Sequence, residues 1–368
     1  MSERGTIRGL AEWGLRAFLF ALAIACTLTI TIVPDWERDL HAENYQEFST
    51  ISSEALKDAE AERRDVTNRL EQTRQEPRKR PWGAFLSLDR NTISRSRSRL
   101  ENGFDAETPG FLAGVDRRLS DTLLLGVVGG FKVTDLSFDD VSSRDRFGDA
   151  QALGHQRTYT GTIGPYLSYT PDAAWYADGS AIGGVLRTST DRAGDGLRGQ
   201  VRGDTSGYRF SLAAGGGYDW RRRGLRLGPH LGVAWDHVHV DGFAESGTPA
   251  DARMLLRVPG SDDELVTLKS GGGGSYVVPV PWGAVLPHWR ADFVYRTLGQ
   301  SRTGRVTLLD GTERTFLRDV PDRTSMEVGL GLQFLLAGEL SFWIDYQENF
   351  LERFYTRTRL TIGVRKQF

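Results

Sequence analysis

Apolar and polar side chains alternate along most of the chain from Trp82 to its end. Successive side chains of a β-strand point to opposite faces, so a period of two predicts strands with one apolar face and one polar face. The stretches 206–220, 283–296 and 325–336 follow this rule, whereas Trp343 stands on a polar face as an exception. A water-soluble β-sandwich shares this alternation, so other features must distinguish it from a membrane barrel.

Turn residues divide the alternating region into twelve segments with connections of two kinds. Those after the second, fourth, sixth, eighth and tenth segments have one or two residues, and those after the first, third, fifth, seventh and ninth reach 24 residues. Short turns on one side and long loops on the other are typical of outer-membrane barrels. The predicted strands are 82–94, 108–118, 121–136, 156–171, 173–190, 205–221, 224–241, 264–281, 283–298, 323–337, 339–351 and 353–368.

Two further patterns favour a membrane barrel. Tyr159 and Tyr169, like Tyr208 and Tyr218, stand ten positions apart, and a tilted strand of that length spans roughly 25 Å, the height of a lipid-facing band with aromatic girdles. The polar faces also hold charges that a dry core would not accept unpaired. We expect the following charged side chains to face a lumen that is filled with water or plugged: Arg209, Asp219, Arg226, Asp236, Arg290, Asp292, Glu327, Arg357, Arg359 and Arg365. The predicted fold is all-β, a 12-stranded antiparallel transmembrane β-barrel.

The N-terminus has the pattern of an export signal. Arg4, Arg8 and Arg16 precede an uncharged apolar run at 17–33, within which Ala23-Ile-Ala25 forms a small-x-small cleavage site. We therefore predict a signal peptide at 1–25. An uncleaved single span reaching residue 33 is the alternative, and Cys26, directly after the cleavage pattern, leaves a lipoprotein open.

A charge-dense stretch without Gly or Pro follows a short polar stretch at 26–52. Ser53 is placed to cap a helix and Pro77 to end it, which predicts a helix at 53–76 in or near the barrel lumen. Its 24 residues would span about 36 Å. Because the apolar stripe is thin, a short coiled coil or a solvated linker are alternatives.

Composition excludes several classes of protein. A formal net charge of −2 gives no reason to expect nucleic acid as a partner. One cysteine excludes an intramolecular disulfide scaffold and a cysteine metal cluster. No Gly-x-Ser-x-Gly, His-Glu-x-x-His or phosphate-loop motif occurs, so we expect neither catalysis nor a cofactor. His237, His239 and Asp241 share one strand face, where the choice is between a metal site and a solvated rim; we expect the rim.

Four stretches, taken in their order and spacing, resemble one known family. The stretches 110–131, 206–220, 226–247 and 357–368 are together similar to the translocator domain of autotransporters, and the resemblance covers about 77–368. It implies a barrel in the outer membrane of a Gram-negative bacterium with a helix threading its pore. It also implies outer-membrane lipids and the barrel assembly machinery as partners, and we expect a monomeric barrel.

The final strand resembles the signal read by that assembly machinery, through Thr361, Gly363 and the terminal Phe368. Lys366 departs from the pattern, which has a hydrophobic residue two positions before the end. An aromatic end and an open strand edge suit edge-to-edge pairing with an assembly factor. Closing the aromatic girdle is an alternative role for Phe368.

Two departures from the family shape the functional prediction. Only residues 26–52 separate the predicted cleavage site from the helix, which is too little for a folded enzyme or adhesin. Asn68 is followed by Arg69, so the Asn-Asn pair at which some members cut themselves is missing. We therefore expect a barrel that anchors or presents a short N-terminal segment through a largely plugged pore. The alternatives are a small porin-like channel, an outer-membrane hydrolase, and a scaffold tethered to the inner membrane.

Overall fold

The computed structural model describes residues 47–76, 80–98, 101–138, 153–171, 174–193, 200–248, 255–298, 303–309, 311–317, 322–336 and 339–368. The predicted signal peptide, its cleavage site, Cys26 and most of the short polar stretch lie outside the described residues. No helix within the described ranges combines the length and the apolarity that crossing a membrane requires.

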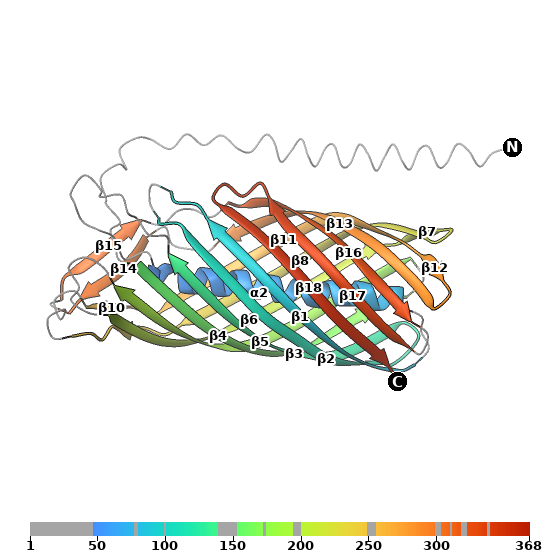
Figure 1. Ribbon diagram of the computed structural model, residues 1–368, viewed down its shortest axis with the longest axis horizontal. Helices are drawn as coiled ribbons and strands as arrows, with labels where there is room; N and C mark the ends of the chain where they lie inside the picture. The colour runs from blue at the N-terminus through green and yellow to red at the C-terminus, as the bar shows by residue number, and fades with distance from the viewer. Residues whose placement is uncertain are drawn as a thin grey trace. The chain divides into compact units, whose positions relative to one another are not determined.

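The chain forms a closed antiparallel barrel around one helix (Figure 1). Each strand pairs with its neighbours in chain order, and β1 closes the barrel against β18 from Gly83–Gln367 to Arg95–Tyr355. The twelve barrel strands are β1 (Trp82–Arg95), β2 (Phe104–Arg118), β3 (Leu123–Phe138), β4 (Leu153–Tyr169), β5 (Trp175–Ala193), β6 (Val201–Tyr218), β8 (Leu225–Val240), β11 (Ser261–Tyr276), β13 (Gly283–Leu298), β16 (Thr324–Leu336), β17 (Leu340–Phe350) and β18 (Tyr355–Gln367). The predicted 12-stranded barrel is confirmed.

Short turns gather at one end of the barrel. Two short strands lengthen hairpins there: β7 (Trp220–Arg222) pairs with β8, and β12 (Val278–Val280) pairs with β13. Arg223 and Gly224, with φ of 49° and 84°, form the two-residue turn between β7 and β8. Positive φ at both central residues is the signature of the turn that matches the twist of a hairpin.

The barrel wall places apolar side chains on its outer face and charged side chains on its inner face, which is the reverse of a soluble protein. Large apolar side chains face outward, with Leu231 69% and Val185 67% exposed. Charged side chains face inward and are buried, Asp236 completely. An exposed apolar band of this kind requires a hydrocarbon surrounding, which excludes the β-sandwich alternative.

The helix α2 (Glu47–Gln75) lies inside the barrel (Figure 1). The predicted start at Ser53 is wrong, because the helix begins six residues earlier, at Glu47. The Ser53 hydroxyl donates a hydrogen bond within the helix to the carbonyl oxygen of Thr50, at 3.1 Å, instead of capping its end. Packing extends the helix beyond the cap that local sequence suggested.

A second sheet stands at the long-loop end of the barrel, beside the start of α2 (Figure 1). Its strands lie in order β15-β14-β10-β9, with β9 (Phe243–Ala244), β10 (Leu256–Val258), β14 (Thr303–Leu308) and β15 (Glu313–Leu317). Sequence analysis missed these strands, which lie in the long connections predicted at 242–263 and 299–322. Phe48 at the start of α2 packs on this sheet, its ring edge-on to Phe243 at 5.6 Å.

Candidate functional site: the lumen around the helix

The lumen is lined by charged side chains that meet charges of α2. Arg290 is half-buried, and the other nine residues predicted to face the lumen are buried. Seven of the ten pair directly with the helix: Arg209 with Glu62, Arg226 and Arg290 with Glu71, Asp236 with Arg63, Glu327 with Arg64, Arg357 with Glu60 and Arg359 with Asp65. An eighth, Arg365, pairs with Glu76, the residue that follows the helix. Asp219 and Asp292 pair with wall residues instead.

These pairs stabilise a helix that is polar on all sides and yet enclosed. A helix that is polar on all sides lacks an apolar face to bury, yet nearly all of α2 is enclosed. Each enclosed charge needs an opposite charge or hydrogen bonds, since an unpaired buried charge is strongly destabilising. The barrel wall supplies those partners from β5, β6, β8, β13, β16 and β18.

One side of the lumen is densely packed. We call it the packed side: α2 residues Asp58, Glu62, Asp65 and Arg69, with Glu76 directly after the helix, against β1–β4, β17 and β18. The Arg69 guanidinium lies between the rings of Phe85 and Trp343, 5.2 and 4.9 Å from their centres. Around them packs an apolar cluster of Val66, Leu70, Phe85, Leu112, Leu124, Val128, Tyr166, Ile182 and Trp343. The helix is held here by dry contacts as well as by charge.

Gly363 makes room for that packing. A Cβ atom at this position would overlap the indole ring of Trp343. Trp343 was the exception to the alternation rule, and the structure explains it: the ring fills the lumen against Arg69. Trp343 was therefore a sequence signal of the packed side, as were inward apolar residues such as Phe85 and Tyr166, and sequence analysis did not use them.

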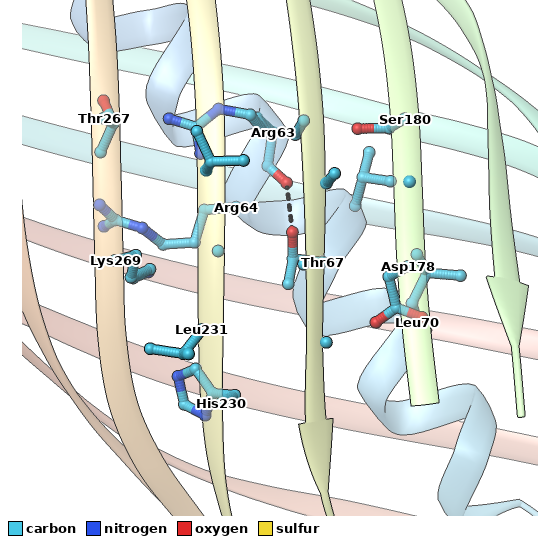
Figure 2. Close-up of a pocket in the computed structure, with 18 of the residues that line it drawn as sticks. Arg63, Arg64, Thr67, Leu70, Asp178, Ser180, His230, Leu231, Thr267 and Lys269 are labelled. Atoms are coloured by element: carbon cyan, nitrogen blue, oxygen red, sulfur yellow. Dashed lines mark hydrogen bonds between the residues drawn. The ribbon is translucent and has the colours of Figure 1, made fainter. Parts of the chain in front are cut away.

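The opposite side of the lumen is open. We call it the cavity side: α2 residues Ser53, Lys57, Glu60, Arg64, Thr67, Glu71 and Gln75 against β5, β6, β8, β11, β13 and β16. A cavity of about 60 Å³ lies there. Figure 2 shows Arg63, Arg64 and Thr67 of the helix behind the strands that carry Asp178, His230 and Lys269. Small wall residues, among them Gly215 and Gly232, leave this space free.

The charges of the cavity side form a connected network. Lys269 lies 2.9 Å from both Asp292 and Glu327. The Arg290 Nε donates to Asp292 at 2.7 Å, and its Nη1 lies 3.3 Å from Glu71. Lys269 and His230, which sequence analysis missed, sit on the polar faces of their strands, so the alternation rule could have found them.

The remaining predicted residues lie on the outer surface or at the seam. Tyr159, Tyr169 and Tyr208 are exposed, and Tyr218 is half-buried edge-on to Trp175 at 5.0 Å. Phe368 is 56% exposed and exchanges backbone hydrogen bonds with Trp82 at 3.2 and 3.0 Å. Thr361 is buried in the lumen.

His237 and His239 lie on the outer face of β8, where β11 adds carboxylates that sequence analysis missed. His239 Nδ1 lies 2.7 Å from Asp262, and its Nε2 lies 3.4 Å from Asp241. His237 Nδ1 lies 3.6 Å from Glu264. No group of three or more His, Cys, Asp or Glu suited to a metal ion occurs among the described residues. His239 is thus held by Asp262, whereas His237 has only the longer contacts to carboxylates of β11.

The chain matches the Autotransporter beta-domain family over residues 84–347. Among curated proteins it is similar to outer membrane protein B of Rickettsia typhi, 23% identical over 278 residues, and of Rickettsia rickettsii, 24% identical over 282 residues. Each alignment covers 72% of this chain and 16% of the relative, so the chain spans less than a fifth of the length of these relatives.

Solved structures share the fold. The translocator domain of autotransporter NalP from Neisseria meningitidis has a TM-score of 0.65 at 13% identity, covering 86% of this chain and all of that domain. The transport unit of the autotransporter AIDA-I from Escherichia coli has a TM-score of 0.57 at 17% identity, covering 80% and 92%. The family and the relatives are named for a barrel and an outer membrane protein, not for a reaction. This protein of the Gram-negative outer membrane therefore belongs to the autotransporter β-domain family.

Proposed function

We propose that the barrel is a translocator whose pore is closed by α2 and which displays the segment preceding Glu47 at the cell surface. The observation that carries this proposal is the set of eight wall residues that pair with charges of α2 and of Glu76 directly after it. These pairs follow the C-terminal half of the helix, from Glu60 onward. A helix that only passed through would not need matched partners.

The direction of the helix supports surface display. The last turn of α2 lies near the short-turn end, where Glu76 accepts hydrogen bonds from Ser341 and Gln367 at 2.7 and 3.0 Å. Its first turn lies at the long-loop end, against the second sheet (Figure 1). Long loops of such barrels face the outside of the cell, so the chain before Glu47 would emerge there.

Planar-bilayer conductance tests the closed pore. Deleting residues 47–76 should raise single-channel conductance several-fold, because the wall alone would enclose a water-filled lumen. A deletion variant that folds, as judged by heat-modifiable gel migration, and conducts like the intact chain would overturn the closed pore. An intact chain that already conducts like the deletion variant would favour the porin-like alternative.

Surface protease treatment of intact cells tests display. A protease-cleavable tag inserted at 35–45 should be cut from outside, whereas the same tag in the short turn at 223–224 should be protected. Protection of both tags would overturn surface display without affecting the closed pore.

Assembly partners form a further part of the proposal. Phe368 is exposed at the end of β18, beside the seam with β1, and an aromatic edge of this kind suits pairing with the assembly machinery. Deleting Phe368 should lower the amount of heat-modifiable barrel in outer-membrane fractions. An unchanged amount would leave Phe368 as a girdle residue facing outer-membrane lipids. We expect the barrel to migrate as a monomer in native gels.

A further inference from the structure

We propose that water and small ions leak past the seated helix along the cavity side, and that two ion pairs, Glu60–Arg296 and Glu71–Arg290, narrow this path. The inference rests on the proposed closed pore, because it assumes that α2 stays in the lumen. It adds a transport activity that a fully sealed barrel would lack.

Three cavities follow one another along the cavity side. The outer cavity lies between Ser53, Lys57 and Tyr355, the middle cavity is the one in Figure 2, and the inner cavity lies between Gln75 and Gln347. Their volumes are about 60, 60 and 30 Å³, against about 10 Å³ for the space beside Arg69 on the packed side. A cavity of about 60 Å³ has room for roughly four water molecules.

The three cavities follow one another along the length of α2. The helix residues that line the outer cavity come from 53–60, those of the middle cavity from 60–74 and those of the inner cavity from 68–75. From the middle to the inner cavity the lining also turns partly around the helix. The cavities therefore form a series along the axis of α2 that winds around it.

Two ion pairs stand where neighbouring cavities meet. Glu60 lines both the outer and the middle cavity, and lies 3.0 Å from Arg296 and 3.5 Å from Arg357. Arg290 lines both the middle and the inner cavity, and lies 3.3 Å from Glu71. Each junction is thus a pair of long side chains, which can part and rejoin, and not a backbone wall.

The cavity walls contain buried polar atoms that need water as a hydrogen-bond partner. Arg63 Nε, Arg74 Nε, Asp178 Oδ1 and Thr267 Oγ1 are buried around the middle cavity without a hydrogen-bond partner among the described residues. Gln75 Oε1 and Gln347 Oε1 are in the same position around the inner cavity. Buried polar atoms of native proteins are satisfied by ordered water when protein offers no partner.

The middle cavity has a charged lining whose cations are all paired. Arg63, Arg64, Arg74, Lys269 and Arg290 line it. Each of them lies within ion-pair distance of a carboxylate. A path lined by such pairs offers polar partners to water and to small ions of either sign.

Single-channel conductance in KCl tests the path. Arg290→Ala should raise the conductance of the full chain several-fold above wild type while staying below the helix-deletion variant. Arg359→Ala breaks a buried helix pair on the packed side, away from the three cavities, and should raise it less. An Arg290→Ala channel that conducts like wild type, or an equal rise in both variants, would overturn the path.

Ion selectivity gives a second readout, measured as the reversal potential across a KCl gradient in the Arg290→Ala background. Lys269→Gln should shift it toward potassium, because Asp292 and Glu327 lose the lysine that lies 2.9 Å from both. Lys132→Gln, which alters a lumen lysine paired with Asp89 at 3.4 Å, should not. Equal shifts would overturn the assigned path. The helix-deletion variant separates the two proposals: if it opens while Arg290→Ala does not, the pore is closed and the leak is wrong.

Discussion

The two sides of the lumen hold the same helix by different physics. On the packed side, Arg69 lies between Phe85 and Trp343 within an apolar cluster. On the cavity side, the wall is thinned by Gly215 and Gly232, and long charged side chains bridge open space. Close packing fixes a position sharply because dispersion contacts vanish within an ångström. Ion pairs across water tolerate small displacements. The packed side therefore fixes the position of the helix, and the side chains of the cavity side adjust to it.

The largest difference in stability between the two sides should appear when an aromatic side chain that contacts the helix is removed from each. Trp343→Ala should cost about 3–5 kcal/mol because it leaves a dry cavity in the packed side. Tyr176→Ala removes the ring on which Arg74 stacks at 3.7 Å, but its space joins the middle cavity and can fill with water, so the cost should be smaller. Urea unfolding in lipid vesicles measures both. Equal costs would contradict the distinction between the two sides.

A matched pair of glycine substitutions tests the same difference in packing, because each adds one methyl group to one side of the lumen. Gly363→Ala should destabilise by about 1–3 kcal/mol, since overpacking strains a filled core, and the new methyl would overlap Trp343. At Gly232 a Cβ would meet Ala214 O at 3.7 Å and Lys269 Cβ at 3.9 Å, which are ordinary contacts. Gly232→Ala should therefore change stability by no more than about 0.5 kcal/mol. A larger loss at Gly232 than at Gly363 would show that the cavity side is the tighter one.

Of the three predicted differences between the two sides, the salt dependence of their ion pairs should be the smallest. The side chains of Arg290 and Glu71 are 14% and 25% exposed, against 3% and 7% for Arg359 and Asp65. Raising salt from 0.1 to 1 M shortens the screening length from about 10 to about 3 Å. The Glu71–Arg290 coupling in a double-mutant cycle should then fall by up to about 1 kcal/mol, while the Asp65–Arg359 coupling should hold. Parallel losses would argue that water reaches both pairs.

The alternation rule predicted the barrel well because it is a purely local signal. All twelve barrel strands were located, including β11, whose glycines at 271–274 weaken the pattern. Placing charges such as Arg209 and Asp236 on polar faces needed only the period of two. Which helix charge each would meet could not be predicted, because that depends on the height and rotation of α2 in the lumen.

What sequence analysis missed depends on long-range packing. Strands β10 and β14 pair from Leu256–Leu308, across a large separation in sequence, and each is too short to show a period. The part of α2 that precedes Ser53 includes Phe48, which docks on that same sheet. Local capping rules favoured Ser53, and tertiary contact overrode them.

The order of charges along α2 has a consequence for where the helix can stop. A slip of one turn, about 5.4 Å along the axis, would bring Arg64 to the height of Glu60, facing Arg296 and Arg357. Like charges would then oppose each other in an enclosed space, so neighbouring axial settings are unfavourable. The charge order along α2 thus acts as an axial register between the helix and the barrel wall.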